Sequence, residues 1–254
     1  MNLRTYLIAM LLLANVVCFS QYQQEMPSNC SSYQYGTVFL SNGESFKTYI
    51  LMDFCNPHSF QYGLQVINEK TFKRLAKGKK VKSKAYEAIE LSTIDGFLLA
   101  SGQRFQKETF ALNQHGIQTK QQLVEVVITG EVAIFKKYYS TNDEFVYRSV
   151  LQSKLQGGQE HLRFMVNNFE VYYKKGNEGR LHNIRNANLT EVFGDNLKLL
   201  KKYQAGVYTF KSEFKRPVTF SANCDLPFLE SLLVMVNDYN KKSLDSYTDL
   251  DTRF

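Results

Sequence analysis

The chain has 254 residues with 19 phenylalanines, 16 tyrosines and no tryptophan, and its formal net charge is +7. The many aromatic residues favour β-strands and supply apolar area for a core. No run beyond the N-terminus approaches eighteen apolar residues, which excludes a membrane-spanning helix there. We therefore expect one β-rich domain, or a β domain with a smaller helical partner, that is soluble or peripherally bound to a membrane.

Residues 1–20 have the parts of an export signal. A short start with one basic residue precedes an apolar run from Leu7 to Val17, and the small residues Cys18 and Ser20 precede a cut before Gln21. We therefore predict an exported protein that is periplasmic, associated with the outer envelope, or secreted.

Two alternating segments predict a β-hairpin near the start of the mature chain. A mobile tail is expected over residues 21–32, which are rich in Gln, Ser and Asn, and regular structure is expected from Tyr35. Gly36–Ser41 and Glu44–Leu51 then flank Asn42-Gly43, a pair that supplies the positive φ angles of a tight turn.

A further strand is predicted from Ser59 to Ile67, after a turn at Asn56-Pro57.

The stretch from Lys70 to Lys84 is the composition anomaly of the mature chain. It holds eight basic residues and no acid, so the rest of the chain carries −1, which is +7 less 8. These residues, called the basic run below, are Lys70, Lys73, Arg74, Lys77, Lys79, Lys80, Lys82 and Lys84. Phe72, Leu75 and Ala76 recur at spacings of three and four before Gly78, which predicts a short helix followed by a loop. This stretch is either a solvated, mobile loop or a surface that faces an anionic partner.

Short apolar pieces separated by turn residues predict further strands from Tyr86 onward. Asp95-Gly96 and Ser101-Gly102 are interpreted as turns in a meander. The later predicted strands are Leu123–Ile128, Val132–Tyr139, Phe145–Leu151, Leu162–Val166, and a hairpin of Phe169–Tyr173 with Arg180–Ile184.

The apolar period changes to about 3.6 at Asn186, which predicts helices. The first begins at a capping box over Asn188–Glu191, is broken at Gly194-Asp195 and ends at Gly206. The second runs from Leu226, capped by Asp225, to Lys241.

We predict an α+β fold, with a predominantly antiparallel sheet or open barrel and two C-terminal helices packed on it. The expected organisation is a signal peptide (1–20), a polar tail (21–32), a β-rich domain (33–185), a helical segment (186–242) and a frayed tail (243–254).

Three cysteines remain after signal cleavage, namely Cys30, Cys55 and Cys224. An oxidising compartment allows one disulfide and leaves one thiol, and all three pairings are open. We favour Cys30 with Cys55, which would fix the tail to the second strand. The alternative is that Cys55 and Cys224 are small buried residues.

Common enzyme motifs are absent: there is no Gly-rich loop followed by Lys-Ser/Thr, no Gly-x-Ser-x-Gly, no His-Glu-x-x-His and no Cys-x-x-Cys. The histidines, His58, His115, His161 and His182, are scattered beside polar or turn residues and are expected to be solvated rather than metal ligands. A pair of Cys224 with one histidine stays open, because such residues meet only in the fold. We predict no catalytic residue, metal or cofactor.

Lysine and aromatic residues interleave at 136–139 and 172–175, as in some nucleic-acid-binding segments. An exported protein rarely meets nucleic acid, and alternate residues of a strand enter a core. We therefore do not expect a nucleic-acid partner.

Several short motifs follow one another along the mature chain. They are the hairpin from Gly36 to Gly43, a lysine-rich stretch leading to Tyr86, Ile94-Asp95-Gly96-Phe97, Gly102, Arg104-Phe105, Ile128–Phe135, Val171–Tyr173, and a last helix closing on Tyr239-Asn240. In this layout the chain resembles a group of uncharacterised exported bacterial proteins of unknown function. The resemblance implies an envelope or secreted protein and no catalytic residue. The group usually has acids within the lysine-rich stretch, and this chain has none there.

We predict a non-catalytic envelope or secreted protein that binds or scaffolds, with the basic run against anionic lipid headgroups or an acidic glycan. Another envelope protein bound at an exposed sheet edge is a further possibility. The alternative is an enzyme of unrecognised class with a cleft between sheet and helices.

Overall fold

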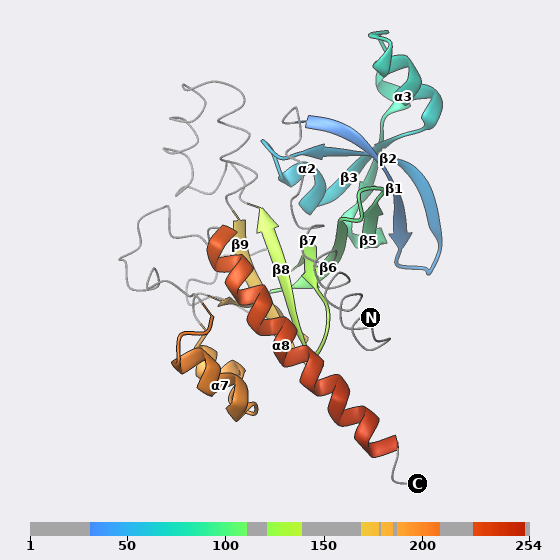
Figure 1. Ribbon diagram of the computed structural model, residues 1–254. Coiled ribbons are helices and arrows are strands. Elements are labelled where there is room, and N and C mark those ends of the chain that lie inside the picture. The colour runs from blue at the N-terminus through green and yellow to red at the C-terminus, as the bar shows by residue number, and fades with distance from the viewer. Residues whose placement is uncertain are drawn as a thin grey trace, which may run out of the picture.

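The computed structural model in Figure 1 describes residues 31–110, 121–138, 169–177, 179–184, 187–208 and 226–251. Within them, ten strands form one open antiparallel sheet in the order β10-β9-β8-β7-β6-β5-β1-β2-β3-β4. The predicted α+β, predominantly β fold class is confirmed. The export signal, Cys30, Cys224, Asp225, His115, His161 and the predicted strands at 145–151 and 162–166 lie outside the described residues.

The strands are β1 (Ser31–Leu40), β2 (Ser45–Asp53), β3 (Gly63–Ile67), β4 (Glu87–Glu90), β5 (Ile94–Leu99), β6 (Arg104–Thr109), β7 (Gln121–Ile128), β8 (Val132–Tyr138), β9 (Phe169–Lys175) and β10 (His182–Asn183). The helices are α2 (His58–Gln61), α3 (Glu69–Ala76), α6 (Leu189–Val192), α7 (Leu197–Gln204) and α8 (Leu226–Asp251), with 3-10 turns η1 (Ser83–Ala85) and η2 (Leu91–Thr93).

The predicted hairpin is β1 with β2, but it starts earlier and turns differently. β1 begins at Ser31 instead of Tyr35, because its pairing with β2 continues to Asp53. Only Gly43 of the Asn-Gly pair has a positive φ, 87°. The Asn42 side-chain oxygen instead accepts a hydrogen bond from the Glu44 N–H at 3.0 Å. The connection is therefore a three-residue loop ending in a left-handed glycine.

Two predicted strand boundaries are wrong. The segment expected as a strand from Ser59 begins with one helical turn, α2, and the strand starts only at Gly63. The buried Gln61 explains this, because its side-chain amide bonds both the N–H and C=O of Tyr138 at 2.9 and 3.0 Å. Asp95-Gly96 is not a turn but part of β5. Gly96 is needed there because a Cβ would lie 2.3 Å from the Phe105 oxygen on β6.

The helical region follows the predicted break at Gly194-Asp195, which separates α6 from α7. The last helix is longer than predicted and continues past Lys241 to Asp251. No glycine or proline occurs between residues 242 and 251 to stop it.

Part of the main core lies between the sheet and α8, which crosses β8 and β9 (Figure 1). Val132, Ile134, Leu232 and Val236 are each fully buried in one apolar cluster. The described part of this interface is therefore a packed core. The opposite face of β1, β2 and β5 carries the more exposed side chains, and α3 stands beside it.

Candidate anion-binding surface

Helix α3 is defined at both ends by its own sequence. The Asn68 side chain caps the first turn by accepting a hydrogen bond from the Thr71 N–H at 2.9 Å. At the other end Gly78 has a φ of 67°. The N–H groups of Gly78 and Lys79 then bond the carbonyls of Leu75 and Arg74 at 2.8 and 3.0 Å. This is a Schellman arrangement, and it confirms the predicted helix followed by a loop.

One face of α3 attaches it to the sheet. Thr71 is buried, and the Phe72 ring stacks on Tyr49 of β2 with 3.9 Å between ring centroids. In Figure 1, α3 stands at the end of the molecule away from α7 and α8. The helix therefore presents its remaining side chains at one extremity of the fold.

All eight residues of the basic run are exposed. Lys73 pairs with Glu69, one turn earlier, at 2.5 Å, and this hydrogen bond and the charge of Glu69 raise the pKa of Lys73. Among the described residues, Lys73 is the one member of the run with a carboxylate partner. Arg74 bonds the Lys80 carbonyl at 3.3 Å and so holds the returning loop near the helix.

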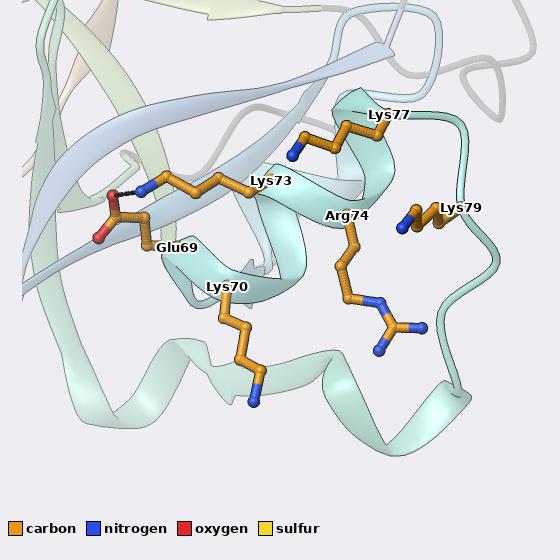
Figure 2. A pocket seen from close by; sticks show the side chains of 6 residues that line it. All are labelled: Glu69, Lys70, Lys73, Arg74, Lys77 and Lys79. Atoms are coloured by element: carbon orange, nitrogen blue, oxygen red, sulfur yellow. Dashed lines mark ion pairs between the residues drawn. The ribbon is translucent and has the colours of Figure 1, made fainter.

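Five members of the run surround a shallow hollow of about 350 Å³ between α3 and the returning chain. The lining residues are Glu69, Lys70, Lys73, Arg74, Lys77 and Lys79. Figure 2 shows Arg74 and Lys79 pointing into this space, while Lys73 is directed at Glu69. Five cations and one carboxylate give the hollow a net charge of +4 (5 less 1). Lys80, Lys82 and Lys84 lie further along the loop and in η1.

Other lysines of the sheet have a different environment. Lys137, Lys174 and Lys175 pair with Glu170, Glu108 and Asp195 at 3.1, 2.9 and 3.2 Å. These pairs connect β8 to β9, β9 to β6, and β9 to the segment between α6 and α7. The basic run is therefore distinguished by its missing carboxylates and not by lysine content alone.

Several of the described residues in the interleaved lysine and aromatic segments are buried. Tyr138 and Tyr172 are buried. Lys136 is buried as well, with its ammonium 4.8 Å from the Phe169 ring centroid. As expected for alternating strands, these rings belong to the core.

The remaining predicted residues are separated in the fold. His58 lies in α2 and His182 in β10, and in the part of the chain that the structure describes no three His, Cys, Asp or Glu residues gather as metal ligands would. Cys55 is disulfide-bonded. Its partner is outside the described residues, so the favoured pairing with Cys30 stays a prediction.

A row of half-buried and exposed side chains beside α3 has no counterpart in the sequence-based predictions. It consists of Phe72, Tyr49, Tyr35, Leu98 and Phe39 and is called the apolar strip below. Alternation in β1 indicates that Tyr35 and Phe39 share a face. The fold adds that these side chains are exposed and that Leu98 of β5 adjoins them.

No family model, curated protein or solved structure matches this chain. Among the described helices, none combines the length and apolar character needed to cross a bilayer.

Proposed function

We propose that this chain is an exported, non-catalytic binding or scaffolding module that is periplasmic, associated with the outer envelope, or secreted. The export pattern of residues 1–20 supports the location. The proposed partner is a polyanion, of the kind presented by anionic lipid headgroups or an acidic glycan. One observation carries the proposal, namely the eight exposed cations of the basic run, of which Lys73 alone pairs with a carboxylate among the described residues.

The expected electrostatic free energy is large enough to give measurable binding. A Lys or Arg near an anionic surface contributes about 1 kcal/mol at moderate salt. The four cations of the hollow that have no carboxylate partner would therefore contribute about 4 kcal/mol together. Such an interaction weakens steeply with added salt, because the Debye length shortens to about 8 Å at physiological ionic strength.

The proposal is tested with mature protein, vesicles containing phosphatidylglycerol, and an immobilised sulfated polysaccharide. Wild type should bind at least one of them at low salt and be released as salt is added. Changing Lys70, Arg74, Lys77 and Lys79 to Gln should weaken that binding at least a hundredfold. The expectation follows from removing about 4 kcal/mol of attraction.

A matched control removes the same charge elsewhere. Arg180, Lys198, Lys201 and Lys241 are also exposed, and they lie outside α3 and its loop. Changing these four to Gln should weaken binding less than tenfold. Equal losses in the two variants, or no binding by wild type at low salt, would show that the basic run is not the contact.

A further inference from the structure

We infer that the polyanion is the surface of an anionic lipid bilayer, and that the apolar strip enters its headgroup region while the basic run contacts the phosphates. This inference rests on the proposed function and names its partner. It is argued from the geometry of the strip, its exposure and the charges around it.

The apolar strip starts at α3 itself. Phe72 stacks on Tyr49 with an interplanar angle of 11°, and the Tyr49 ring lies 5.1 Å from that of Tyr35. Leu98 follows on the next strand, opposite Thr37. A continuous row therefore runs from the basic helix across β2, β1 and β5.

The outer members of this row face solvent. Tyr35 is 44% exposed, Leu98 39% and Phe39 37%. These three residues come from adjacent strands, whereas the other large exposed apolar residues of the described chain, Leu197, Val207 and Val234, belong to the helical region. A grouped patch of this kind indicates a contact surface, while single exposed apolar residues do not.

The charged residues next to the strip on its sheet face are positive. Lys47 lies opposite Thr37 on β2, and Arg104 lies opposite Leu98 on β6. Both are exposed. The outward positions of β1 from Tyr33 to Phe39, and of β2 from Ser45 to Leu51, hold no acid. The strip is thus bordered by cations as well as joined to α3.

A bilayer fits this combination better than an acidic glycan does. Leu98 and Phe39 offer only apolar surface, which gains free energy in the interfacial region of a membrane. Aromatic residues favour that region, and lysine and arginine contact its phosphates. Weak apolar insertion and a basic patch together are the two signals that give stable peripheral binding.

The test separates the strip from the basic run. One variant changes Tyr35, Phe39 and Leu98 to Thr, and its control changes Leu197, Val207 and Val234 to Gln, so that each loses three exposed apolar side chains and no charge. Binding to phosphatidylglycerol/phosphatidylcholine vesicles should fall at least tenfold in the strip variant and stay unchanged in the control. The salt concentration that elutes each protein from heparin should not move.

A reporter variant avoids dependence on the folding of the triple substitution. The chain has no tryptophan, so Leu98→Trp introduces a single tryptophan, whose emission can be excited at wavelengths where the tyrosines absorb little. Its emission should shift to the blue on adding the anionic vesicles, and lipids brominated near the headgroup should quench it.

The outcomes distinguish the two proposals. Vesicle binding by the strip variant that equals wild type, or a Leu98→Trp emission that does not shift, overturns the bilayer inference while the basic run stands. Wild type that binds heparin but no vesicle overturns it too and identifies an acidic glycan. If the variant lacking four hollow cations binds both like wild type, the proposed function itself fails.

Discussion

A single side-chain amide joins helix α8 to the turn between β7 and β8. Asn240 Oδ1 accepts a hydrogen bond from the Val132 N–H at 2.9 Å, and its Nδ2 donates to the Val132 carbonyl at 3.0 Å. Gly130 makes room for it, since a Cβ there would lie 2.3 Å from Nδ2. Asn240 thus acts as a strand-like partner on the side of Val132 where the pairing with β7 does not extend, while β9 pairs with its other side.

Replacing Asn240 by Ala should therefore lower the free energy of unfolding by about 2–4 kcal/mol. The change leaves the buried N–H and C=O of Val132 without partners, at roughly 1–3 kcal/mol for each such group. The measurement is urea denaturation followed by circular dichroism. Lys241→Ala, at the next and exposed position, should change stability by less than about 0.5 kcal/mol. Equal midpoints for the two variants would show that Asn240 does not hold the helix.

At the scale of elements, the sequence predicts best where a segment carries its own signals. Helix α3 has its cap at Asn68 and its stop at Gly78 within a few residues, so both helix and loop were predictable. The division of the helical region into α6 and α7 was predictable for the same reason, because Gly194-Asp195 lies between them. The hollow beside α3 follows from this local structure and the lysine composition.

Elements that depend on distant partners were not predictable. Gln61 leaves the expected strand because it bonds Tyr138, a residue far along the chain. Gly96 stays in β5 because β6 approaches it closely. The apolar strip likewise exists only because β5 returns to pair with β1. Single-sequence periodicity identifies faces of strands but not which face is covered.

The hairpin of β1 and β2 leads to a prediction about the disulfide. Ser31 pairs with Asp53. Cys30 directly precedes Ser31 in the sequence, and the disulfide-bonded Cys55 follows Asp53 by two positions, so the two cysteines are near the same end of the hairpin. We predict that a peptide map of unreduced protein recovers Cys30 linked to Cys55. Closing this loop should stabilise the fold by about 2–4 kcal/mol, because it restricts the unfolded chain.

Reduction, or Cys55→Ser, should lower the denaturation midpoint correspondingly, and Cys224→Ser serves as the control that should not. A crosslinked peptide containing Cys224 instead of Cys30 would contradict the pairing.

For the molecule as a whole, buried tyrosines and partnered aspartates set how stability depends on pH. Burial acts to raise the pKa of Asp195, but hydrogen bonds from Tyr239 and Lys175 outweigh it and leave the pKa below its usual 3.8. The pKa of Asp238 is lowered in the same way: burial acts to raise it, but hydrogen bonds from Lys202 and Tyr208 outweigh the burial. Because the folded pKa values are depressed, this stabilisation is present above about pH 4 and is lost as the pH falls through them.

At alkaline pH the stability is expected to change in the opposite direction, falling as the pH rises. Burial raises the pKa of Tyr33 to about 12. Burial, followed by the hydrogen bond to Asp195, also raises the pKa of Tyr239 well above its usual 10.0. Unfolded tyrosines ionise near pH 10 while these stay protonated in the fold, so stability should fall as the pH rises above about 10. Each such tyrosine adds a slope of at most about 1.4 kcal/mol per pH unit.

Tyr239→Phe tests both limbs at once, because the hydroxyl donates to Asp195 at 2.5 Å. Without it the pKa of Asp195 should move upward toward its unfolded value, so the stability lost as the pH falls below about 4 should become smaller. The free energy of unfolding should fall less steeply above pH 10, with its slope reduced by up to about 1.4 kcal/mol per pH unit, which corresponds to one proton. The measurement is the free energy of unfolding in urea between pH 3 and pH 12, with Tyr35→Phe at the exposed strip position as the control. A Tyr239→Phe profile parallel to wild type on both sides would mean that this hydroxyl does not link the two titrations.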